Sequence, residues 1–211
     1  MATVITLAQQ KGGSGKTTLT THLACELAAR GHKVALIDTD PQGSLGRWFM
    51  TRWERETGLK GDITFSTSSA WGVTFESQKL AKDHDYVLID TPPKIDSDLK
   101  PALKAADLVV VPVSASQVDL WATEGVLDLA QREGMRPLAV LNRARGGTKL
   151  TGKVLAALDE LEADPAKTVI GQRVAYAEAI GVGQGVCEFP GAKAASEEMA
   201  TLTDEILSHL R

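Results

Sequence analysis

The sequence predicts an α/β fold: a doubly wound, mostly parallel sheet with helices on both faces. Two observations predict it. Short apolar runs alternate with longer segments of helical pattern from one end of the 211-residue chain to the other. The runs are apolar at nearly every position, as in parallel strands that are covered on both faces.

The expected elements follow one another in a regular order. The segment Gly58–Val73 is rich in Gly, Ser and Thr, so we expect its one strand near a sheet edge. The segment Ile180–Gly191 carries four glycines and reads as a loop, with the nucleotide site as one place that it can face. The expected strands are Thr3–Ala8, Lys33–Asp38, Ile63–Thr67, Tyr86–Asp90, Leu108–Val113 and Leu138–Asn142. The expected helices are Thr17–Arg30, Leu45–Glu56, Ser97–Ala105, Asp119–Glu133, Lys149–Leu161 and Lys193–Leu210.

Composition fits one cytoplasmic domain that covers residues 1–211. The chain is 43% hydrophobic and 24% charged, and it shows no basic, apolar leader and no run of roughly 20 apolar residues. Cys25 and Cys187 form neither a disulfide framework nor a metal-ligand spacing, and Cys25 reads as a buried thiol. The net charge of −4 argues against an overall basic surface. It leaves nucleic-acid binding open, because affinity depends on the few cations that meet phosphates.

A glycine-rich run between the first strand and the first helix predicts a phosphate site. Its glycines let the backbone turn tightly and aim N–H groups at a polyphosphate, and the helix start adds its positive dipole end. In this pattern Lys16 reaches the β- and γ-phosphates, and the Thr17 hydroxyl ligates Mg²⁺. The expected nucleotide-binding residues are Lys11, Gly12, Gly13, Ser14, Gly15, Lys16, Thr17 and Thr18.

Acidic residues end two of the expected strands, at the sheet edge where α/β folds bind ligands. Asp38 and Asp40 follow the second strand, although turn formation alone also explains an acid, a proline and a glycine there. The apolar run Tyr86–Ile89 closes on Asp90, the pattern of a strand whose acid holds Mg²⁺. Asn142 ends another strand, where its amide offers both a donor and an acceptor and can also simply form a turn.

The motifs together resemble those of the ParA/MinD superfamily. Residues 11–17 match its deviant phosphate-loop pattern K-G-G-x-G-K-[ST], in which Gln10 replaces the usual first glycine. Residues 38–44 resemble the family's D-x-D-P-Q-G-[NS] switch, and residues 90–93 resemble its second switch.

The resemblance implies an ATPase with the cofactors ATP and Mg²⁺. It implies that Lys11 crosses a dimer interface to the partner's nucleotide, that Asp40 orients the attacking water, and that Asp38 supports the metal with Thr17 and Asp90. It also implies that Asn142 reads adenine and that Arg143 covers the ring. The catalytic residues on this reading are Lys11, Lys16 and Asp40.

Within the superfamily the chain is most similar to small ParA-type partition ATPases. Such a protein would form an ATP-dependent homodimer, bind DNA nonspecifically at the nucleoid, and respond to a ParB-like or cargo-adaptor protein. The chain begins at the first strand, without the helix-turn-helix extension of larger partition ATPases. No membrane binding is expected, because acids line the polar face of the last helix. The candidate DNA contacts are Arg143, Arg145, Lys149, Lys153, Arg173 and Lys193.

The sequence also leaves open an alternative function of another class that uses the same fold. It is a metabolic phosphate-loop enzyme, such as an ATP-dependent ligase of the dethiobiotin-synthetase type. That alternative needs a set of polar substrate-binding residues beside the γ-phosphate, and no such set is evident in the sequence.

Overall fold

A computed structural model describes residues 2–55, 59, 61–93, 99–135, 137–145, 149–160 and 163–210, apart from the side chains of residues 117, 149–151, 155, 159 and 160. Within these ranges the chain forms one seven-stranded sheet in the order β3-β2-β4-β1-β5-β6-β7, and every pairing is parallel. The predicted fold class is confirmed, and the strand Ile63–Thr67 lies at a sheet edge as expected. The strands are β1 Thr3–Leu7, β2 Val34–Asp38, β3 Ile63–Thr67, β4 Tyr86–Asp90, β5 Leu108–Ser114, β6 Leu138–Asn142 and β7 Asp164–Pro165.

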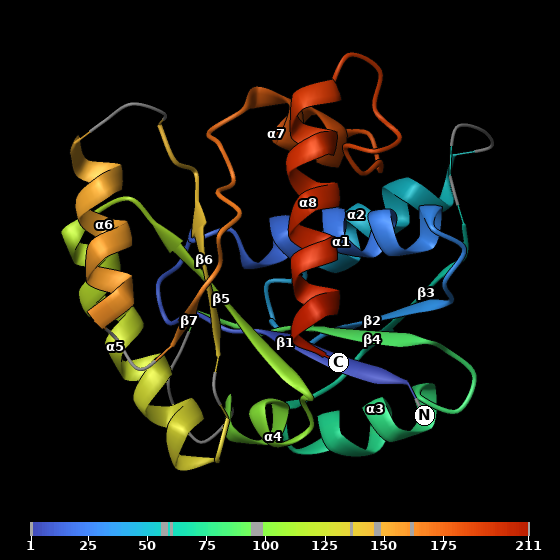
Figure 1. Cartoon of the computed structure of the whole chain (residues 1–211). Helices are drawn as coiled ribbons and strands as arrows, with labels where there is room; N and C mark the ends of the chain where they lie inside the picture. The colour runs from blue at the N-terminus through green and yellow to red at the C-terminus, as the bar shows by residue number, and fades with distance from the viewer. Residues whose placement is uncertain are drawn as a thin grey trace.

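Helices cover both faces of the sheet (Figure 1). α1, α2, α7 and α8 lie on one face, and α3 and α4 lie on the other. Alternate strand residues supply the two sides of the core: Ile5 and Leu7 pack toward α1 and α8, whereas Val4 packs toward α3. The helices are α1 Lys16–Ala29, α2 Ser44–Trp53, α3 Val73–Leu80, α4 Leu99–Lys104, α5 Gln117–Arg132, α6 Lys149–Glu160, α7 Val174–Gly181 and α8 Lys193–His209, with a 3₁₀ turn at Ala70–Gly72.

Helices α3 and α7 and strand β7 are not among the elements expected from the sequence. Helix α3 buries Val73 and, one turn later, Ser77, while Phe75 is 72% exposed. A serine therefore occupies the inward position that an apolar residue would mark, so the helical period is hidden. Strand β7 has two residues, too few to produce any pattern, and extends the sheet through Ala139 opposite Pro165.

The last helix packs its apolar residues against the rest of the molecule. Met199, Leu202 and Ile206 are buried in the same core cluster as α1. Fully burying a side chain of this size contributes roughly 1.5–3 kcal/mol, so these apolar residues are accounted for by the fold. Among the residues that the structure describes, no helix is long and apolar enough to cross a membrane.

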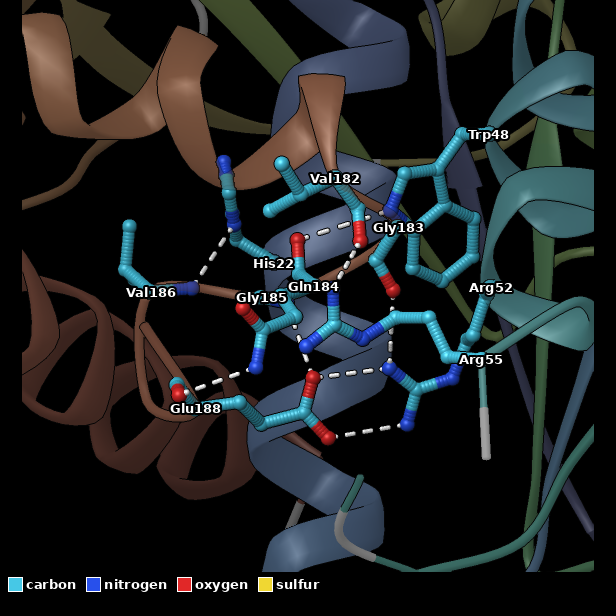
Figure 2. A network of polar contacts seen from close by, with 10 residues as sticks. All are labelled: His22, Trp48, Arg52, Arg55, Val182, Gly183, Gln184, Gly185, Val186 and Glu188. Atoms are coloured by element: carbon cyan, nitrogen blue, oxygen red, sulfur yellow. Dashed lines mark hydrogen bonds and ion pairs between the residues drawn. The ribbon is translucent and has the colours of Figure 1, made fainter. Parts of the chain in front are cut away.

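The segment between α7 and α8 packs on α1 and α2 through a buried polar network (Figure 2). The guanidinium of Arg52, in the last turn of α2, pairs with both carboxylate oxygens of Glu188, at 2.7 and 2.9 Å. The backbone N–H of Val186 donates to Nδ1 of His22 on α1, at 3.2 Å. Residues 183–188 hydrogen-bond with α1, α2, the end of α7 and one another. Whether the segment faces the nucleotide stays a prediction.

Candidate functional site

The glycine-rich run links β1 to α1 in the predicted place. Gly13 and Gly15 have φ values of 77° and 99°, which favour glycine and let the loop fold back over the start of α1. Helix α1 begins at Lys16 directly after this turn. The loop and the positive end of the helix therefore converge on one point, as an anion site requires.

Two side chains of the first helical turn face the end of β4. Lys16 is buried, with 6% of its surface exposed, and burial lowers the pKa of its ammonium group although Asp90 and Asp40 oppose the shift. The Thr17 hydroxyl donates to Oδ2 of Asp90 at 2.6 Å. Leu7 lies opposite Asp90 in the parallel register of β1 and β4, so the sheet itself brings the loop and the acid together.

The residues around Asp90 fit a magnesium ion. Oδ1 of Asp90 is buried without a hydrogen-bond partner among the described residues, and burial raises the pKa of this carboxyl to about 7. A divalent cation would satisfy the orphaned oxygen and favour the ionised form. In the described ranges no group of three or more His, Cys, Asp and Glu could hold a metal unaided. That suits Mg²⁺, which is held by one or two carboxylates together with waters and phosphates.

The two acids after β2 have different environments. Asp38 is buried, and its oxygens accept the backbone N–H groups of Asp40 at 3.0 Å and Gly46 at 3.1 Å. Burial raises the pKa of Asp38, and these hydrogen bonds oppose the shift. Asp38 therefore shapes the loop after β2, and its charge helps to raise the pKa of Asp90. Asp40 is partly exposed and borders a groove of about 630 Å³ that also contains Met50 and Pro92.

The other lysine of the loop lies at the surface. The side chain of Lys11 is 40% exposed, and its ammonium group contacts Oδ2 of Asp119 at 2.8 Å. Ser116 caps α5 by accepting the N–H of Asp119, and its hydroxyl donates to the same carboxylate. The S-x-x-D spacing of residues 116–119 signals such a cap, but nothing in the sequence links Asp119 to Lys11. The contact with Asp119 is thus a feature that sequence reasoning missed.

Two further polar residues anchor the loop. The amide of Gln9 is buried, donates to the carbonyl of Pro112 and to the Thr123 hydroxyl, and accepts the N–H of Gln10. The Thr91 hydroxyl donates to the carbonyl of Leu7 at 2.7 Å. The contacts of Gln9 fasten the start of the loop to β5 and α5, and the contact of Thr91 ties the end of β1 to the residue after β4. The sequence places Gln9 beside the motif, but gives no signal for its partners.

Asn142 and Arg143 border a hollow next to the start of α1. The hollow has a volume of about 350 Å³ and is large enough to begin enclosing a base. The amide of Asn142 already contacts the phosphate loop, since Nδ2 donates to the carbonyl of Ser14 at 2.9 Å. Whether Asn142 also reads adenine, and Arg143 covers it, stays a prediction. The lining consists of Thr18, Asn142, Arg143, Gly171, Gln172, Arg173, Tyr176, Ala177 and Ile180.

The candidate DNA contacts divide into two groups. Arg173 pairs with Glu198 at 2.6 Å, and Lys193 lies 3.9 Å from Glu197, so neighbouring acids offset both charges. Arg143, Arg145 and Lys153 are exposed. The side chain of Lys149 lies outside the described part of the structure. Arg145 also donates to Oε1 of Gln172 at 2.8 Å, and whether these residues contact DNA stays a prediction.

Comparisons with known proteins show which family the chain resembles. Residues 5–186 match the family model described as CobQ/CobB/MinD/ParA nucleotide binding domain. The chain is 27% identical over 215 residues to maintenance of carboxysome distribution protein A from Halothiobacillus neapolitanus, covering 98% of this chain and 97% of that protein. It is 30% identical over 241 residues to the chromosome-partitioning ATPase Soj from Thermus thermophilus, covering 98% and 96%.

Solved structures share the fold. The ATP complex of Cyanothece McdA superposes with a TM-score of 0.79 at 19% identity, covering 97% of this chain and 96% of that chain. The structure of pNOB8 ParA bound to nonspecific DNA superposes with a TM-score of 0.70 at 20% identity, covering 99% of both. Because the family model spans most of the chain and the partition ATPase Soj is 30% identical to it over nearly the whole length, this protein belongs to the ParA/MinD family of P-loop ATPases.

Proposed function

We propose that this protein hydrolyses Mg-ATP as a dimerising switch that binds DNA nonspecifically in its ATP state and positions a DNA or protein cargo. The observation that carries the proposal is the difference in exposure between the two lysines of the glycine-rich loop. Lys16 is buried within its own subunit, whereas the side chain of Lys11, in the same loop, is 40% exposed. A surface lysine next to the phosphates can serve a nucleotide on a second subunit.

Asp40 is the proposed positioner of the attacking water. It is the more exposed of the two switch acids and borders the groove at the carboxyl ends of the strands, where a water can enter. Lys16, Thr17 and Asp90 would hold the β- and γ-phosphates and Mg²⁺, and the bound ion would neutralise charge that develops on the phosphates. Two relatives are named for partition and for carboxysome distribution. Those names support cargo positioning, with a ParB-like or cargo-adaptor protein as the stimulating partner.

The test uses three variants and light scattering. Asp40→Ala should bind Mg-ATP, lose at least tenfold in turnover and accumulate as a dimer, because the γ-phosphate persists. Lys11→Ala should bind nucleotide yet remain monomeric, and Lys16→Ala should bind nucleotide at least tenfold more weakly. ATP turnover by Asp40→Ala at the wild-type rate would show that another residue positions the water.

ATPase rates with and without DNA separate this proposal from a metabolic enzyme. A ligase of the dethiobiotin-synthetase type would need a small organic substrate and would ignore DNA. The proposed protein would hydrolyse ATP slowly alone and bind unrelated DNA sequences alike. A monomeric Asp40→Ala variant at saturating Mg-ATP would count against the switch and favour the metabolic reading.

A further inference from the structure

The amide of Asn142 lies between the end of β6 and the phosphate loop. Asn142 is 2% exposed, and its Oδ1 accepts the backbone N–H of Arg143 at 2.9 Å. A backbone N–H can only donate, so this contact fixes which end of the amide is oxygen. The Nδ2 group is then the end that meets the carbonyl of Ser14, at 2.9 Å.

Gly15 is fitted to the same amide. A Cβ built on Gly15 would stand 2.2 Å from Nδ2 of Asn142, a distance that no real contact allows. Gly15 also has a φ of 99°, which other residues rarely adopt. The amide therefore occupies the space that a side chain at position 15 would fill.

The contact sets the orientation of one peptide unit of the loop. The carbonyl of Ser14 and the N–H of Gly15 belong to the same planar trans peptide and point in opposite directions. When Nδ2 holds the carbonyl toward β6, the N–H of Gly15 points away from β6. Aligned N–H groups are what a phosphate loop offers its ligand, so Asn142 acts on the part of the site that every polyphosphate uses.

We propose that Asn142 is a positioning residue of the phosphate loop, whose contribution to affinity does not depend on the base. The inference rests on the nucleotide site of the proposed function and changes the role expected for this residue from the family resemblance. Beyond these two contacts the Asn142 amide has one N–H and one lone pair left, with which it can also bind a base. Recognition of the base by Asn142 is therefore the competing outcome of the test.

Calorimetry with three magnesium-loaded ligands distinguishes the two roles: ATP, GTP and inorganic tripolyphosphate. The variants are Asn142→Ala and Asn142→Leu, the second of which fills the same space without the hydrogen bond. We expect both variants to bind all three ligands at least tenfold more weakly than wild type does. The ratio of ATP affinity to GTP affinity should stay unchanged within about twofold. Ser77→Ala is the matched control, because it removes a buried hydroxyl hydrogen bond on the opposite face of the sheet.

Amide hydrogen exchange of the nucleotide-free protein supplies a second readout. Exchange in residues 9–18 should be faster in both Asn142 variants than in Ser77→Ala and wild type. The inference is overturned if ATP affinity falls while tripolyphosphate affinity is kept, if the ATP preference over GTP disappears, or if Asn142→Leu retains wild-type affinity. A wild-type protein that binds none of the three ligands would instead contradict the proposed function.

Discussion

At the scale of single residues, the site depends on which atoms are already satisfied within the chain. The second oxygen of Asp90 lacks a partner among the described residues, whereas both oxygens of Asp38 accept backbone hydrogen bonds. Asp90 is therefore the acid better placed to take a new ligand, and Asp38 the acid that holds the switch loop in shape. The sequence suggested a metal role for both.

Removing the carboxylate that holds Lys11 should make ATP-driven dimerisation easier. Lys11 must leave Asp119 before it can reach a second subunit, and a partly exposed ion pair contributes about 1 kcal/mol or less. In an Asp40→Ala background, Asp119→Asn should lower the protein concentration at half-dimerisation by about threefold to tenfold, measured by sedimentation with Mg-ATP. The asparagine keeps the helix cap with Ser116, so the fold should be unaffected.

The control for this change is Asp128→Asn, an exposed acid of the same helix. It removes one negative charge, as Asp119→Asn does, but leaves the ion pair of Lys11 intact. The protein concentration at half-dimerisation should therefore stay unchanged. Weaker dimerisation of Asp119→Asn would mean that Asp119 presents Lys11 to the partner rather than restraining it.

Residue types near the motifs could be predicted from the sequence, but their partners could not. The G-K-T ending and the apolar run before Asp90 carry local patterns, so Thr17 and Asp90 were expected to meet. The ion pair of Lys11 joins residues 108 positions apart, and the contact of Asn142 with Ser14 spans 128. Such pairings depend on how β1, β5 and β6 stand side by side, which no local pattern encodes.

At the scale of elements, a buried ion pair fastens α2 to the segment before α8. The side chains of Arg52 and Glu188 are 5% and 0% exposed, and Arg52 also lies 5.6 Å from the ring of Trp48. Figure 2 shows this network between α2 and the loop. Because α2 begins one residue after Gly43 of the switch loop, the pair holds the helix from which that loop extends.

Breaking this pair should destabilise the protein strongly. Glu188→Ala leaves the Arg52 guanidinium buried without its carboxylate, which costs about 3–5 kcal/mol of unfolding free energy. The double variant Arg52→Met, Glu188→Leu should recover most of that loss, since apolar residues of similar volume replace both charges. Urea denaturation measures both effects.

Glu197→Ala is the matched control for an exposed pair. Lys193 and Glu197 are 89% and 66% exposed, so this change should cost less than about 1 kcal/mol. Equal losses for Glu188→Ala and Glu197→Ala would contradict the account of the buried pair.

The five central strands and α1 were predicted within one residue of their bounds. The strands are short runs that are apolar at nearly every position, and α1 directly follows the glycine-rich run. Helix α3 was missed because Ser77 lies where the period expects an apolar residue. The glycine-rich segment before α8 was recognised as a loop, but its attachment to α1 and α2 depends on charges far away in the sequence.

At the scale of the whole molecule, one buried imidazole should make stability depend on pH. Burial lowers the pKa of His22 to about 4, and its Nδ1 accepts the N–H of Val186, so Nε2 carries the proton and donates to the carbonyl of Tyr176. Between pH 6.5 and 4 the unfolded chain binds a proton at this position that the folded chain excludes. Stability should therefore fall as pH falls through this window.

The size of the effect follows from the shift of about 2.5 pKa units, or roughly 3 kcal/mol. Between pH 7 and pH 4 the unfolding free energy should fall for both proteins, and the fall should be about 3 kcal/mol larger for wild type than for His22→Gln. His209→Gln, at the exposed end of α8, should behave as wild type. Parallel pH profiles for wild type and His22→Gln would show that His22 is protonated at a normal pKa in the folded protein.

The proposed DNA surface is also a property of the whole molecule. The net charge is −4, yet Arg143, Arg145 and Lys153 are exposed in one stretch of sequence after β6. A symmetric dimer would double this set, and linked phosphate contacts bind together far more tightly than separate ones. The basic character of this stretch was readable from the sequence, whereas the pairing of Arg173 with Glu198 was not.

The most direct test of the central claim is a mobility-shift titration of the Asp40→Ala protein on unrelated DNA sequences with Mg-ATP and with Mg-ADP. The account predicts binding with ATP, none with ADP, equal affinity for each sequence, and a steep loss between low and physiological salt. Adding Lys11→Ala should abolish the shift while nucleotide binding is kept. DNA binding that is indifferent to the nucleotide, or absent at low salt from an ATP-bound dimer, would contradict the claim that ATP gates a DNA-binding state.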